Sequence, residues 1–191
     1  GNEIAKLIDA KLFIRKRASA LAIQKEDAPY VLHVASHAFF LSQEEKNQDP
    51  LARSGIVLAG ANNPEKYSTD DGYLTAKEVS TLNLQGTEMV VISGCDSNKG
   101  EIYSGEGIYG LKRAIAVAGA RSSLLSLWKV DDNIASAFMI SFYKNLVSGM
   151  SRTKALLETQ TEFRKSSNPY YRHIGAWGAF QLSGDWRPID F

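Results

Sequence analysis

The chain has 191 residues, of which 44% are hydrophobic, and this is enough for one globular core but short for two. We therefore expect a single domain over residues 1–191. A net charge of +1, from 22 basic and 21 acidic side chains, gives no strong field to attract nucleic acid or an anionic membrane. No apolar run approaches the roughly 20 residues that span a bilayer, and the basic N-terminal region lacks a signal-peptide pattern.

The sequence contains one cysteine, Cys95, so no disulfide can form within the chain. A lone cysteine fits a reducing compartment, and we expect a soluble, cytoplasmic protein. A buried cysteine that only packs is the common explanation for such a residue. A reactive thiol is the alternative, and the surrounding sequence has to decide between them.

The first half of the chain predicts short elements separated by polar loops. Apolar residues at helical spacing predict a helix over residues 2–23, with a basic run at 15–17 that we interpret as a solvated face rather than a nucleic-acid site. Strands are predicted at 30–35 and 55–60, with polar loops at 42–50 and 62–72. Thr75 and Glu78 have the spacing of a capping box, which opens a short helix.

The second half alternates strands with longer helices. Residues 89–93 are continuously apolar, as in a strand covered on both faces of a parallel sheet. A loop at 96–107, a strand at 122–127 and a last strand at 177–182 are also expected. Between these strands the pattern predicts three helices. The first has Leu111, Ile115 and Ala118 facing inward and ends at Gly119, and the third starts at Ser151. The second is capped by Asp131 or Asp132 and ends before Gly149, and its apolar face consists of Ile134, Ala137, Phe138, Phe142 and Leu146. This order predicts a three-layer α/β domain with a mostly parallel sheet.

His37 and Cys95 each follow a predicted strand directly, and they lie 58 residues apart in the chain. In a parallel α/β sheet, catalytic groups gather beyond the carboxyl ends of the strands. A thiol attacks an acyl carbon as the thiolate, and a neighbouring imidazole both lowers the thiol pKa and protonates the leaving amine. The two residues therefore form a candidate nucleophile and general base.

Several short segments, in order along the chain, resemble the CHAT domain, a branch of the caspase and separase superfamily. Each segment is weak alone, but their order over residues 32–132 makes coincidence improbable. The segments are LHVASH (32–37), SGIVLAG (54–60), DGYLTAKE (71–78), SGC (93–95), GEGIYGL (105–111), AGA (118–120), SLWKVDD (126–132) and the terminal LSGDW (182–186).

The resemblance implies a caspase-like three-layer sandwich and a cysteine endopeptidase that works through an acyl-enzyme intermediate on Cys95. It assigns the base to His37 and the oxyanion donors to the backbone N–H groups of Cys95 and Ala38. The family usually has glycine after the histidine, so Ala38 departs from the pattern. That departure could tilt the donor or crowd the substrate.

Other residues that could carry chemistry have simpler interpretations. We interpret His33 as a strand histidine bonded to backbone and His173 as an ordinary surface or loop residue. One cysteine and three scattered histidines offer no metal-ligand spacing, and no cofactor is implied. The glycines at 105, 107 and 110 lack the residues of a phosphate-binding loop, so a turn is the favoured explanation.

The resemblance also assigns a substrate pocket to the segment after the strand at 122–127. Asp132 matches an acidic position of separases, and with Asp131 and Trp128 it would favour a basic residue before the scissile bond. Helix capping by either aspartate is the alternative.

CHAT domains usually extend further on the N-terminal side, so we expect that this chain lacks N-terminal strands and an upstream regulatory region, possibly of tetratricopeptide repeats. A protein substrate and such a repeat region or partner chain are the expected partners. Two competing hypotheses remain: an inactive CHAT-like interaction module, and an acyltransferase that uses the same pair of residues.

Overall fold

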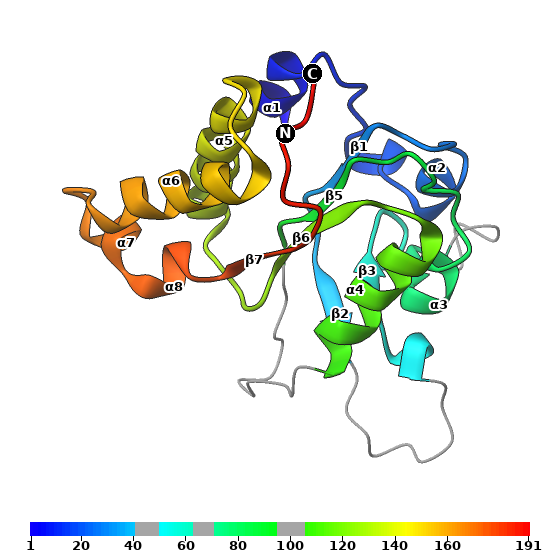
Figure 1. Ribbon diagram of the computed structural model, residues 1–191. Helices are drawn as coiled ribbons and strands as arrows, with labels where there is room; N and C mark the ends of the chain where they lie inside the picture. Colours follow the sequence, from blue (N-terminus) through cyan, green and yellow to red (C-terminus); the bar gives the residue numbers. More distant parts are fainter. Residues whose placement is uncertain (41–49, 63–70, 95–105) are drawn as a thin grey trace.

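The computed structural model describes residues 1–40, 50–62, 71–94 and 106–191. Its centre is a four-stranded sheet in the order β1-β5-β6-β7, in which the first three strands are parallel and the last is antiparallel (Figure 1). The strands are β1 (Val31–Val34), β5 (Met89–Ile92), β6 (Ser122–Ser126) and β7 (Phe180–Gly184). The predicted mostly parallel sheet is thereby confirmed.

Helices lie on both faces of this sheet, which gives three layers. Figure 1 shows α1, α5 and α6 on one side and α2, α3 and α4 on the other. The helices of the first side, with two short ones after them, are α1 (Asn2–Leu7), α5 (Asp132–Val147), α6 (Arg152–Arg164), α7 (Pro169–Arg172) and α8 (Ile174–Trp177). Those of the second side are α2 (Ala20–Gln24), α3 (Ala76–Val79) and α4 (Glu106–Ala118).

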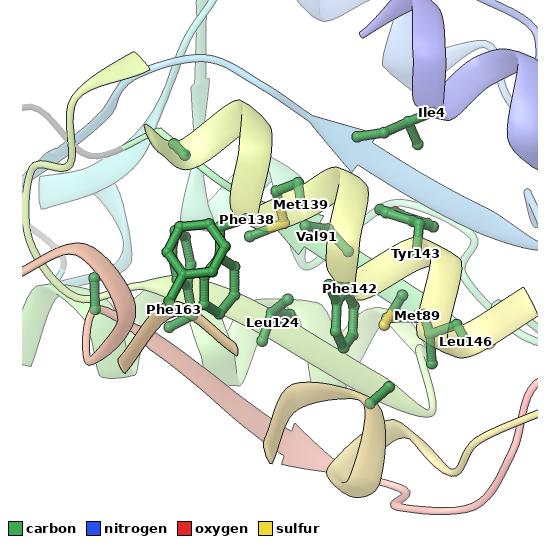
Figure 2. Close-up of a cluster of buried hydrophobic side chains, with 14 of the residues drawn as sticks. Ile4, Met89, Val91, Leu124, Phe138, Met139, Phe142, Tyr143, Leu146 and Phe163 are labelled. Atoms are coloured by element: carbon green, nitrogen blue, oxygen red, sulfur yellow. The ribbon is translucent and has the colours of Figure 1, made fainter. Parts of the chain in front are cut away.

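Alternate side chains of the strands enter different cores, because successive residues of a strand point to opposite faces. Met89 and Val91 of β5 face α5, where an aromatic cluster with Phe138 and Phe142 fills the space (Figure 2). Val90 and Ile92 face α3 and α4 on the other side. All four residues of β5 are buried, as its unbroken apolar sequence predicted.

A second, antiparallel sheet in the order β2-β3-β4 contributes to the core on the α3 and α4 side. Its strands are β2 (Ala38–Phe40), β3 (Ser54–Val57) and β4 (Tyr73–Thr75). Two turns of 3-10 helix complete the described elements, η1 (Arg15–Arg17) and η2 (Pro50–Arg53). The strand predicted at 55–60 therefore ends earlier, at Val57, and belongs to this separate sheet.

The predicted helix starts are confirmed by their caps. Thr75 Oγ1 accepts from the Glu78 N–H at 3.2 Å while the Glu78 carboxylate accepts from the Thr75 N–H at 2.8 Å, which is a complete capping box. Ser151 caps α6 through the N–H of Lys154. Each cap satisfies amide groups that the first turn of a helix leaves without a partner.

The single N-terminal helix predicted over 2–23 is wrong. The chain forms α1, a 3-10 turn and α2 instead, and Asp9 and Arg15 take positive φ angles of 48° and 53° that no α-helix contains. The physical reason is a lack of burial between the two helices, where Ile14 is 48% exposed. Apolar spacing alone does not make a helix when no core covers the stripe.

Two further boundaries differ from the prediction. Trp177 ends α8 and its indole N–H donates to the Arg172 carbonyl, so β7 begins only at Phe180. The loop predicted at 96–107 lies outside the described residues up to 105, and α4 begins at Glu106. Leu111, Ile115 and Ala118 face the core as predicted.

A cluster of charges around one buried guanidinium lies at the edge of the sheet where the parallel strands begin. Arg152, at the start of α6, is fully buried, and its guanidinium donates to the Glu88 carboxylate and to the Arg187 carbonyl, the latter at 2.8 Å. Asp185 lies 3.5 Å from the same guanidinium, and Arg121 pairs with Glu88 at 2.9 Å. The Arg187 side chain pairs with Asp185, and its hydrogen bond is the main reason why the pKa of that carboxyl lies well below its usual range.

Removal of the buried guanidinium should destabilise the fold strongly. We expect Arg152→Met to lower the free energy of unfolding by about 3 kcal/mol or more, because the half-buried Glu88 and Asp185 would each lose a buried partner. Urea denaturation monitored by circular dichroism measures this loss. Lys154→Met, an exposed change on the same helix, is the control, and equal stability of the two variants would contradict the role given to Arg152.

Candidate active site

His37 lies where the chain passes from one sheet to the other. β1 of the main sheet ends at Val34 and β2 of the second sheet starts at Ala38, so His37 is the last residue of a three-residue connection. Its side chain is exposed, and among the described residues no hydrogen bond to the imidazole is found. Its carbonyl accepts from the Val57 N–H at 2.7 Å.

The end of β5 packs directly against this connection. The Ser93 N–H donates to the Val34 carbonyl at 3.1 Å. Gly94 lies so close to the next peptide that a β-carbon at position 94 would overlap the Ser36 carbonyl group, with 2.6 Å to its carbon and 3.2 Å to the His37 nitrogen. Only glycine fits here without displacing backbone. Cys95 lies outside the described residues, and Gly94 is the last described residue before it.

Ala38 is 3% exposed, and the register of β2 directs its N–H away from β3. In an antiparallel pair, residues alternate between positions that exchange hydrogen bonds and positions whose polar groups point away. The Val57 N–H donates to the His37 carbonyl, so His37 and Val57 form a hydrogen-bonded pair. The next pair, Ala38 with Ile56, is therefore one whose polar groups point away from each other. The Ala38 N–H therefore points away from β3.

The segment after β6 lies at the same edge of the main sheet, because β1, β5 and β6 are parallel. Trp128 is 39% exposed and its indole N–H donates to the Gly175 carbonyl at 3.0 Å. Asp131 caps α5 by accepting from the N–H groups of Asn133 and Ile134 at 2.9 and 3.3 Å. Asp132 is the first residue of α5 and is exposed. Of the two candidate caps, Asp131 makes the bonds.

His33 lies beneath this edge in a closed environment. Its Nε2 lies 3.1 Å from Ser93 Oγ, and its ring stacks on Tyr143 of α5 with centroids 5.5 Å apart and planes at 10°. Burial lowers the pKa of His33 to about 4, so its imidazole is uncharged at neutral pH. The expected strand position is confirmed, but the bond partner is a serine hydroxyl rather than backbone. Burial also raises the pKa of Tyr143.

The remaining histidine has a local role. His173 is exposed, and its Nδ1 accepts from the Gly175 N–H at 3.1 Å, which caps α8. In the part of the chain that the structure describes, no three His, Cys, Asp or Glu side chains gather as metal ligands would. No helix within the described ranges combines the length and apolar character needed to cross a membrane.

Comparison with known proteins agrees with this architecture. The mixed α/β fold, with a mostly parallel sheet between helices, is consistent with the caspase-like peptidase superfamily, and the family model of the CHAT domain matches residues 1–185. The chain belongs to the CHAT domain family. The human tetratricopeptide repeat protein 28 is 32% identical to it over 111 residues, which is 58% of this chain and 4% of the human protein. The matched part is thus a small fraction of that relative.

The sequence interpretation missed the contacts of two serines at the site. The hydroxyl of Ser36 donates to the Val57 carbonyl, and Ser93 contacts both His33 and Val34. Both serines stand next to the motif residues, so the motif itself was the available signal. Their partners lie in other strands, and that pairing requires the register of the two sheets.

The pKa of His33 makes a testable pH dependence. The unfolded chain binds a proton at His33 below its ordinary pKa of 6.5, whereas the folded chain does so only near pH 4. Stability therefore falls as pH drops from about 6.5 to 4, by an amount on the order of 3 kcal/mol. Urea unfolding of wild type and His33→Phe across this range should show a clearly larger fall in the wild type.

His173→Asn removes a different histidine and keeps a residue that caps well, so it should retain the wild-type pH dependence. A His33→Phe protein with the same pH dependence as wild type would contradict the assignment to His33.

Proposed function

We propose that this domain is a cysteine endopeptidase in which Cys95 is the nucleophile and His37 is the general base. The observation that carries the proposal is the contact of Gly94 with the peptide between Ser36 and His37. Gly94 is the last described residue before Cys95 in the chain, and it lies beside the backbone of His37. This connectivity supports a thiol and an imidazole within reach of each other.

The proposed reaction is acyl transfer in two steps. His37 takes the thiol proton, and the thiolate attacks a peptide carbonyl carbon to form a C–S bond. Collapse of the tetrahedral intermediate breaks the C–N bond, and the imidazolium gives its proton to the departing amine. Water then attacks the thioester, His37 accepts a proton from it, and the carboxylic acid product leaves with the thiol restored.

The oxyanion of the intermediate needs fixed donors, and we assign these to the backbone N–H groups of Ala38 and Cys95. The N–H of Ala38 points away from β3, and this supports the assignment because no backbone bond to β3 uses it. A donor fixed in a strand needs little reorganisation when negative charge develops, which is the condition for strong electrostatic catalysis.

The environments of the two histidines favour His37 as the base. His33 is enclosed and hydrogen-bonded to Ser93. Its pKa of about 4 makes it a weak base at neutral pH. His37 is exposed at the strand end, where a substrate can approach.

For the substrate we propose a basic residue before the scissile bond, read by the carboxylate of Asp132. Asp131 caps α5, whereas Asp132 is exposed at the same edge of the sheet as His37. The indole bond of Trp128 to Gly175 would hold one wall of the pocket. Burial of a carboxylate and a cation together on binding gives a charge-assisted contact stronger than a neutral one.

The whole protein would carry further parts. The name of the human relative includes tetratricopeptide repeats, and we propose that such a repeat region, in the same or a partner chain, regulates this domain.

The first test removes the two reactive groups. We expect Cys95→Ala and His37→Ala to abolish cleavage, while His33→Ala, assayed as folded protein, retains it. Mapping of new protein N-termini in a cell extract treated with each variant measures cleavage without a known substrate. Labelling of Cys95 by a peptide with an electrophilic C-terminus reports whether the site accepts an acyl group.

Cleavage by a folded Cys95→Ala protein would refute the mechanism. Absence of both new termini and peptide labelling with the wild type would favour the alternative, an inactive interaction module. Transfer of an acyl group to another acceptor, with no new termini, would favour the acyltransferase.

The second test concerns the charge at position 132. Asp132→Asn should reduce kcat/KM for Arg or Lys before the scissile bond by roughly tenfold or more, as expected for loss of a hydrogen bond between charged groups. Alkylation of Cys95 by a small reagent should be nearly unchanged. A peptide library cleaved by both proteins measures the preference.

Asp131→Asn is the matched control, because asparagine caps helices as well as aspartate does. An unchanged preference in Asp132→Asn removes Asp132 from the pocket. A changed preference in Asp131→Asn alone would transfer the role to Asp131.

A further inference from the structure

We infer that Ser36 is a positioning residue for His37, and that its hydroxyl fixes the main chain from which the imidazole projects. This inference rests on the proposed function, because it assigns a role within the same site. It concerns described residues only, namely Ser36, His37, Val57 and Gly94.

In the part of the chain that the structure describes, the imidazole of His37 has no hydrogen-bond partner of the kind that usually orients a catalytic histidine. Cysteine and serine peptidases of many folds use a third side chain to hold the ring. Among the described residues no group bonds to the His37 ring, and its side chain is exposed. Within the described residues, the hydrogen bonds that hold His37 are therefore those of its main chain.

That main chain is held by Val57 through an irregular pairing. A regular antiparallel pair at this position would exchange two backbone bonds. The Val57 N–H does donate to the His37 carbonyl at 2.7 Å. The Val57 carbonyl, however, accepts from the Ser36 hydroxyl, and no bond from the His37 N–H to it is found between these two described residues. The hydroxyl thus replaces one rung of the ladder.

Val57 is a firm anchor because β3 is the central strand of the second sheet. It pairs with Tyr73 of β4 on the other side, and Ile56 beside it is 3% exposed. One bond from this strand holds the Ser36 side chain and the other holds the His37 carbonyl, so the two bonds lie on either side of the His37 Cα atom. A turn of the main chain at His37 would redirect the imidazole, and the two bonds oppose such a turn.

Gly94 packs against the peptide between Ser36 and His37. The Ser36 carbonyl contacts Gly94, so a shift of Ser36 would change the approach of the β5 end and of His37 together. A substrate-binding role for the hydroxyl is disfavoured, because its proton is already donated to Val57. Positioning is the role that all three contacts support.

Alkylation of Cys95 provides the test, since this is the single cysteine of the chain. The rate of reaction with iodoacetamide between pH 5 and 10 gives the apparent pKa of the thiol. A properly placed imidazole lowers that pKa below its ordinary value near 8.5. The proteins compared are wild type, His37→Ala, Ser36→Ala, Ser36→Thr, Ser36→Val and Ser148→Ala. Ser148 also donates its hydroxyl to a backbone carbonyl, that of Asn145, and serves as the matched control.

We expect His37→Ala to raise the thiol pKa, and Ser36→Ala to raise it in the same direction with roughly a three- to tenfold slower reaction at pH 7. Ser36→Thr keeps a hydroxyl and should stay near wild type, whereas Ser36→Val has the same shape without the hydroxyl and should behave like Ser36→Ala. Ser148→Ala should match wild type. If Ser36→Ala does not fold, the comparison of threonine with valine decides.

Hydrogen exchange of the Val57 amide is the second measurement, and it does not depend on the thiol. Loss of the Ser36 hydroxyl should speed this exchange, because the bond from the Val57 N–H to the His37 carbonyl would no longer be supported by the bond from Ser36 to the Val57 carbonyl. Equal thiol profiles for Ser36→Thr and Ser36→Val, with a shift in His37→Ala, would overturn the role of Ser36 and leave the proposed function standing. No shift in His37→Ala would overturn the proposed pair of residues and the positioning role with it.

Discussion

The buried guanidinium of Arg152 is the constraint on which the arrangement of the sheet depends. A charge in the interior is tolerated only where carboxylates and carbonyls surround it. Here they come from Glu88, immediately before β5, and from Asp185 and Arg187, after β7. The ion pair with Arg152 holds Glu88 in place, and this sets which residue begins β5. A slip by one residue would move Met89 and Val91 to the opposite face and place every side chain of β5 in the wrong core.

The two edges of the main sheet have different tasks. The charged cluster occupies the edge where β5 and β6 begin, and antiparallel β7 brings Gly184 and Asp185 back to that edge beside Ser122. His37, Gly94 and Asp132 follow the other ends of the parallel strands. Stability and the proposed chemistry thus rest on separate groups. Exposed His37 and Asp132 can be changed without entering either hydrophobic core, whereas Arg152 cannot.

The sequence predicted those features that depend on local pattern. The continuous apolar run of β5, the capping box at Thr75 and Glu78, and the position of His33 in a strand each follow from neighbouring residues. What it could not predict depends on partners far along the chain. The bond of Ser36 to Val57, the stacking of His33 on Tyr143 and the separate sheet of β2, β3 and β4 all require strand register. The N-terminal helix was wrong for the same reason, since burial decides whether an amphipathic stripe becomes a helix.

The position of the Ala38 methyl group explains why alanine can follow the proposed base at a position where the family usually has glycine. Glycine at this position would leave the most room for a substrate, so a side chain could be expected to crowd the site. The methyl group of Ala38 is instead part of the buried cluster with Ile56 and Leu74, and only 3% of the residue is exposed. Because side chains and backbone amides of a strand point in different directions, a methyl in the core leaves unchanged the N–H that points away from β3. The substitution therefore adds apolar contact on one side of β2 and removes no donor from the other. Its geometry supports the proposed role of Ala38 in holding an oxyanion.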